Sequence, residues 1–109
     1  MSRTLRVASR ARADVDHIFD WLVHRSVRGA IAWYLALRGA VDQIAASPES
    51  FAEAPEAVPL GLPLRQSLFK TRRGRMYRII FDFTDAEITL LRVRGPGQAP
   101  LRQKELPKE

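Results

Sequence analysis

The stretch Arg75–Arg94, RMYRIIFDFTDAEITLLRVR, decides the fold, because it contains two strand-like runs joined by a short polar break. The runs are rich in Ile, Val, Phe and Tyr, whereas the break at Thr84–Glu87 contains Thr and Asp, which suit turns. Side chains alternate between the two faces of a strand. The pattern therefore predicts a β-hairpin with one apolar face and a second face that is apolar but carries arginines.

The elements around this hairpin predict an α+β domain. Thr4–Ala8 alternates and is expected to form an edge strand, and apolar residues recur at helical spacing over Ala11–His24 and Ala30–Ala46. The two helices should pair as an antiparallel αα-hairpin. After a proline-containing connector at residues 48–63, alternation resumes over Leu62–Thr71. The predicted order is β-α-α-β-β-β, with the helical hairpin on one face of an antiparallel-rich sheet of about four strands.

The length of the chain predicts a single domain, because 109 residues can build one core but not two. We expect residues 1–96 to form this domain and residues 97–109 to be an extended or mobile tail. No apolar run is long enough to span a membrane, and no signal-peptide pattern is visible. The absence of cysteine excludes disulfides and thiolate metal sites. These features favour a cytoplasmic protein with no membrane association.

The net charge of +6 is confined to the half of the chain that contains the hairpin. Residues 1–61 hold seven basic and seven acidic side chains, whereas residues 62–104 hold ten basic and three acidic ones. This asymmetry points to nucleic acid or to an acidic protein as the partner, and charge does not choose between them.

Basic residues on the predicted strands are the candidate site. The four arginines predicted to share the sheet face away from the helices are Arg65, Arg78, Arg92 and Arg94. Because no counter-charge is evident beside them, we favour an anion-binding surface over solvated strand arginines. For the basic residues of the turn at positions 70–75, charge that only solubilises the turn explains the sequence equally well. The residues predicted to bind a target or an acidic partner are Arg65, Lys70, Arg73, Arg78, Arg92 and Arg94.

Tyrosine and histidine offer little evidence for catalysis or metal binding. Tyr77 shares the apolar strand face with Ile79, so we interpret it as a core tyrosine with its hydroxyl at the rim. His17 and His24 are seven residues apart, which is not the four-residue spacing of a helical metal site. The sequence therefore predicts no metal site.

The first helix also carries acidic and aromatic residues. Asp14, Asp16 and Asp20 are interpreted as a solvated helix face. Trp33 in the second helix is most simply a packing residue. Trp21 lies off the main apolar stripe, so a contact with a partner or a second copy is an alternative to packing.

A series of short motifs runs from residue 4 to about residue 96. It comprises Ala13-Asp14-Val15 with Ile18 and Trp21, Ala32-Trp33, Ser47-Pro48, Leu60-Gly61 before Leu64-Arg65, Tyr77–Phe81 and Ile88–Arg94. In this order and spacing the sequence resembles the RelE/ParE superfamily of bacterial type II toxins, often labelled plasmid stabilisation proteins. The resemblance implies a small toxin that a cognate antitoxin wraps and holds inactive, which makes a hetero-oligomer of the two proteins an expected assembly. We expect no cofactor.

Members of this superfamily divide by target: RelE-like toxins cut messenger RNA on the ribosome, and ParE-like toxins poison DNA gyrase. The nucleases resemble one another in having basic residues on the sheet and a Tyr or His near the C-terminus, and residues 95–109 contain neither. The resemblance therefore implies gyrase inhibition slightly ahead of RNA cleavage. If the chain is a nuclease, the candidate catalytic residues are Arg65, Arg78, Arg92 and Arg94. A silent module that only binds an antitoxin is the other alternative.

Overall fold

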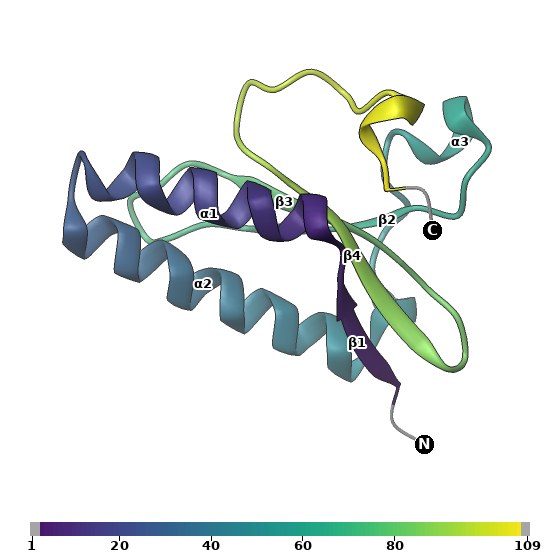
Figure 1. The fold of residues 1–109 in the computed structure, drawn as a ribbon. Helices are drawn as coiled ribbons and strands as arrows, with labels where there is room; N and C mark the ends of the chain where they lie inside the picture. The colour runs from purple at the N-terminus through teal and green to yellow at the C-terminus, as the bar shows by residue number, and fades with distance from the viewer. Residues whose placement is uncertain (1–2, 108–109) are drawn as a thin grey trace.

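The computed structural model describes residues 3–107, in which a helical hairpin covers one face of a four-stranded mixed sheet (Figure 1). The hairpin consists of α1 (Ser9–Val23) and α2 (Val27–Ala46). The strands are β1 (Thr4–Val7), β2 (Arg65–Phe69), β3 (Tyr77–Phe83) and β4 (Glu87–Arg94). This arrangement confirms the predicted α+β class and the order β-α-α-β-β-β.

The sheet has the strand order β1-β4-β3-β2, so the predicted hairpin of β3 and β4 occupies its centre. β1 lies at an edge, as predicted, and pairs parallel to β4, whereas the other two pairings are antiparallel. A bulge interrupts the central pairing, because Ile80 is opposite Arg92 while Phe81 is opposite Leu90. Leu91 is therefore the extra residue of β4 at this point.

The first core lies between the helices and the sheet. Trp33, Leu37 and Ile44 of α2 are buried against Ile79 and Phe81 of β3. Burial of each such side chain stabilises the fold by roughly 1.5–3 kcal/mol. The apolar stripe of α2 is therefore core, as predicted.

The sheet face away from the helices is also covered. Ile80 and Leu91 pack there against Leu64, the residue that directly precedes β2, and against Leu101 and Leu106. Two short helices, η1 (Pro48–Ser50) and α3 (Ala57–Leu60), lie between α2 and β2. A third, η2 (Gln103–Glu105), follows β4. Figure 1 shows α3 beside the C-terminal segment on this side of the sheet. The described part of the predicted tail, residues 97–107, is thus fixed to the domain by two buried leucines.

The second helix begins earlier than predicted. Its first residue is Val27, because the hydroxyl of Ser26 accepts a hydrogen bond from the amide of Gly29 at 3.0 Å and caps the helix. The sequence prediction began the helix at Ala30, where the apolar stripe begins, and so missed the cap. No helix within residues 3–107 is long and apolar enough to cross a membrane.

Replacing Ser26 by alanine should lower the free energy of unfolding by about 1 kcal/mol, because the substitution leaves an amide at the N-terminus of α2 without its acceptor. Urea denaturation followed by circular dichroism measures this change. Ser9→Ala is the matched control, since α1 begins at Ser9 and makes no side-chain cap hydrogen bond. Equal losses for the two variants would contradict the assignment of Ser26 as the cap.

Candidate functional site

The structure divides the four arginines that were predicted to share one face. Arg65 is paired with Phe81, which lies in the core beneath the helices. Its guanidinium donates to the carbonyl oxygen of Phe51 at 2.5 Å and lies 5.4 Å from the ring centre of Phe83. Arg78 is directed to the opposite face, so the prediction of a single arginine face is wrong. Both faces of the sheet are buried, and an apolar pattern therefore could not identify the face that meets the helices.

Arg78 is neutralised by Glu56, a side chain of the connector. Its guanidinium binds both carboxylate oxygens of Glu56 and also donates to the side-chain oxygen of Gln66 at 3.2 Å. Glu56 is 2% exposed and accepts a further hydrogen bond from the amide of Leu101 at 2.9 Å. The hydrogen bond from Arg78, aided by the Leu101 amide and opposed by burial, lowers the pKa of Glu56 to about 2. The pair therefore holds the C-terminal segment on the sheet.

Arg92 is bound by Asp14 of α1. Its Nε and Nη2 atoms donate to the two carboxylate oxygens at 2.7 and 2.9 Å, and Nη1 donates to the carbonyl of Glu105 at 2.7 Å. Asp14 also accepts from the amide of Val93 at 2.9 Å. The hydrogen bonds that Arg92 donates to Asp14 raise the pKa of Arg92. The prediction that Asp14 belongs to a solvated face is therefore wrong.

Arg94 lies directly opposite Arg78 in the sheet. It is buried, donates to the carbonyl of Ala99 at 2.7 Å and lies 3.9 Å from the carboxylate of Glu105. Burial is the main cause that lowers the pKa of Arg94, and the neighbouring charges have smaller effects. The expected absence of counter-charge is thus wrong for all three arginines on this face, because acidic residues distant in the sequence supply it. Their predicted binding role stays a prediction.

Four basic residues lie exposed on the turn between β2 and β3. None of them forms an ion pair with the described residues; they are Lys70, Arg72, Arg73 and Arg75. The turn is tight at Gly74, where an added Cβ would lie 2.2 Å from the hydroxyl oxygen of Thr71. Of the six predicted binding residues, the structure therefore gathers Arg78, Arg92 and Arg94 and leaves Lys70 and Arg73 exposed on this turn.

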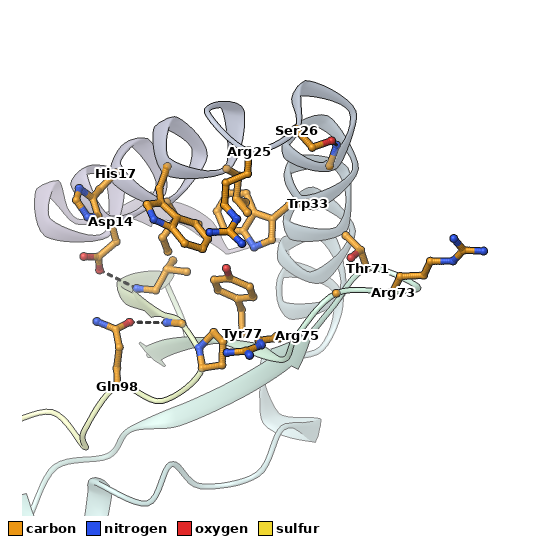
Figure 2. Close-up of a pocket in the computed structure, with 18 residues that line it drawn as sticks. Asp14, His17, Arg25, Ser26, Trp33, Thr71, Arg73, Arg75, Tyr77 and Gln98 are labelled. Carbon is orange, nitrogen blue, oxygen red and sulfur yellow. Dashed lines mark hydrogen bonds between the residues drawn. The ribbon is translucent and has the colours of Figure 1, made fainter.

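A cleft of about 950 Å³ lies beside the turn, between α1, the α1–α2 connection and the end of β4. Figure 2 shows Tyr77 rising from β3 toward Arg25 and Trp33, with Arg75 near its base and Arg73 directed away. Tyr77 and Trp33 meet edge to face with their ring centres 5.5 Å apart. Gly95 leaves room for this packing, since an added Cβ would lie 3.2 Å from the tyrosine ring.

Polar groups in this cleft lack partners. The indole nitrogen of Trp33 is buried without a hydrogen-bond acceptor among the described residues, a state that costs about 1–3 kcal/mol. The hydroxyl of Tyr77 makes no hydrogen bond to residues 3–107. Burial raises the pKa of Tyr77 although Arg75 opposes the shift, so the hydroxyl stays protonated at neutral pH. The packing of Tyr77 agrees with its interpretation as a core residue at the rim.

No pattern in the sequence marks this cleft as a site. Trp21 was flagged because it lies off the apolar stripe, and it is 53% exposed on the cleft wall. The guanidinium of Arg25 lies 4.7 Å from the centre of its ring. From the sequence, Trp33 was interpreted as a packing residue, and Arg75 was left open between a solubilising charge and a contact residue. No local pattern connects either residue with α1.

A helical hairpin over a four-stranded mixed sheet, with a basic turn beside an open cleft, is compatible with the RelE/ParE fold of small bacterial toxins. The model of a family described as the ParE toxin of the type II toxin–antitoxin system, parDE, matches residues 5–100. The chain therefore belongs to the ParE toxin family and is the toxin of a type II toxin–antitoxin module, whose partner is an antitoxin. A search of curated proteins found no match.

Proposed function

We propose that this toxin inhibits growth by binding DNA gyrase and that its cognate antitoxin neutralises it by binding the toxin. One observation carries the choice against RNA cleavage: Arg78, Arg92 and Arg94 are each held by carboxylates or carbonyls of the same chain. Cleavage of RNA requires a base, an acid and cations free to stabilise a phosphate. Engaged arginines favour a toxin that acts by binding.

The exposed turn between β2 and β3 is the surface proposed to meet the target. Lys70 and Arg73 carry positive charge there without an intramolecular ion pair. Unpaired exposed cations attract an acidic or anionic surface and accelerate its association. This proposal retains two of the six residues predicted from the sequence and assigns the three paired arginines to folding.

The purified toxin should inhibit supercoiling of relaxed plasmid by DNA gyrase. Replacing Lys70 and Arg73 together by glutamine should raise the toxin concentration needed for half-inhibition about fivefold, since each exposed charge contributes modestly. The double variant Arg12→Gln/Arg38→Gln is the matched control, because it removes two exposed charges from the helices. An equal loss of potency in this control would contradict a specific contact by the turn.

Induced expression without an antitoxin distinguishes the alternatives. Growth arrest with unchanged messenger RNA is the expected result, and co-expression of the cognate antitoxin should restore growth. Codon-linked cuts found by primer extension would instead support a RelE-like nuclease. Normal growth would support a silent antitoxin-binding module.

A further inference from the structure

The cleft between α1 and the β2–β3 turn has hydrogen-bonding capacity that the chain itself does not use. Trp33 and Tyr77 both line it, and neither the indole N–H nor the hydroxyl has a partner among residues 3–107. Nearly all buried donors in proteins are paired. The indole N–H of Trp33 is therefore a buried donor that no described residue satisfies, and the hydroxyl of Tyr77, whose ring packs on Trp33, is a second donor open to a ligand from outside.

The charge of the cleft selects a negative acceptor. Arg25, Arg73 and Arg75 contribute to its lining, and the one acidic lining residue, Asp14, is already bound to Arg92. A ligand in the cleft therefore meets cationic side chains together with the neutral hydroxyl of Tyr77. A carboxylate matches both sets, because it accepts hydrogen bonds from each of them.

Much of the remaining lining is apolar. Ile18, Leu22, Val93 and Pro96 lie along it, and the exposed ring of Trp21 continues the apolar surface toward solvent. A free phosphate would fill none of this surface. A base of a nucleic acid would compete with Arg25, which already lies over one face of the Trp21 ring.

We propose that the cleft binds an acidic side chain of the antitoxin together with an apolar side chain beside it. The carboxylate lies among Arg25, Arg75 and the hydroxyl of Tyr77, and the apolar side chain packs on Trp21 and its neighbours. This inference rests on the proposed neutralisation by an antitoxin. It adds the part of the toxin that is recognised and the chemistry of the recognised segment.

The two tryptophans of the chain both line the cleft, so intrinsic fluorescence reports its occupation. The probe is the blocked tetrapeptide acetyl-Leu-Glu-Phe-Glu-amide, and its counterpart contains glutamine at both acidic positions. The acidic peptide should change the fluorescence with a Kd of about 0.1–1 mM, and the neutral one should bind about tenfold more weakly.

Two variants examine the assigned groups. Tyr77→Phe should weaken binding of the acidic peptide about fivefold without destabilising the protein, because the hydroxyl has no intramolecular partner to lose. Arg75→Gln should weaken it about threefold and reduce its dependence on salt. Arg72→Gln is the matched control, since Arg72 is exposed on the same turn but does not line the cleft.

Equal binding of the acidic and neutral peptides would overturn the proposal, as would an equal effect of Arg72→Gln and Arg75→Gln. Displacement of the acidic peptide by lower concentrations of a uridine hexanucleotide would assign the cleft to nucleic acid instead. The titration contains neither gyrase nor cells. Its failure would leave gyrase inhibition standing, and peptide binding by a toxin without effect on gyrase would leave the cleft assignment standing.

Discussion

Replacing Glu56 by alanine should reduce the free energy of unfolding by about 3–5 kcal/mol, because it leaves the charge of Arg78 partly buried without its partner. The side chain of Glu56 is 1% exposed and that of Arg78 is 18% exposed, so water replaces the lost interaction poorly. The substitution also removes the acceptor for the amide of Leu101. Urea denaturation at pH 7 measures the loss, and proteolysis should then cut first within residues 97–107.

The contribution of Glu56 should vanish in acid. Its pKa is lowered from 4.5 to about 2 by the hydrogen bond from Arg78 and the Leu101 amide, against the effect of burial. A carboxyl with a depressed pKa stabilises the fold fully above its unfolded pKa and loses this contribution as the pH falls toward the folded value. A shift of this size corresponds to about 3 kcal/mol. The gap between wild type and Glu56→Ala should therefore narrow between about pH 5 and pH 2.

Glu53→Ala is the control for this result. Glu53 is exposed in the same connector, and its loss should change stability by less than about 0.5 kcal/mol. In a double-mutant cycle, adding Arg78→Met to Glu56→Ala should cost far less than Arg78→Met costs alone. Additive losses would show that the two side chains act independently and would contradict the assignment.

Sequence patterns predicted the elements of this protein because each pattern depends on nearby residues. The alternation around Ile79 and the helical stripe around Trp33 both report which side chains are apolar and how they are spaced. The same patterns did not predict on which face of the sheet Arg65 lies. Both faces of this sheet are buried and therefore apolar, so an apolar pattern does not identify the face that meets the helices. The second cover comes from Leu101 and Leu106, which stand in a segment with no periodicity.

The partners of the arginines could not be predicted for a different reason. Glu56 is 22 residues from Arg78, and Asp14 is 78 residues from Arg92. No local rule joins residues so far apart. Asp14 was interpreted together with Asp16 and Asp20 as one solvated helix face, yet residues two apart, such as Asp14 and Asp16, point in different directions from a helix. The cleft was missed for the same reason, because Trp21 and Arg75 line one cleft only after α1 packs beside the β2–β3 turn.

Replacing Asp14 by alanine should reduce the free energy of unfolding by about 3 kcal/mol. Its carboxylate joins α1 to β4 through three hydrogen bonds, two from Arg92 and one from the amide of Val93. β1 pairs with β4 only as far as Leu90, so Asp14 satisfies a strand amide beyond the end of that pairing. Side chains of Asp14 and Arg92 are 16% and 15% exposed, and solvent therefore compensates little. Thermal denaturation followed by circular dichroism measures the loss.

Asp16→Ala is the matched control, because Asp16 is exposed on the same helix and should change stability by less than about 0.5 kcal/mol. Asp14→Asn separates the two functions of the carboxylate. The amide oxygen can still accept from Val93 but no longer neutralises Arg92, so its loss should lie between those of Asp16→Ala and Asp14→Ala. A loss in Asp14→Asn equal to that in Asp14→Ala would assign the whole effect to charge. Equal stability of Asp14→Ala and wild type would contradict the proposed link between helix and sheet.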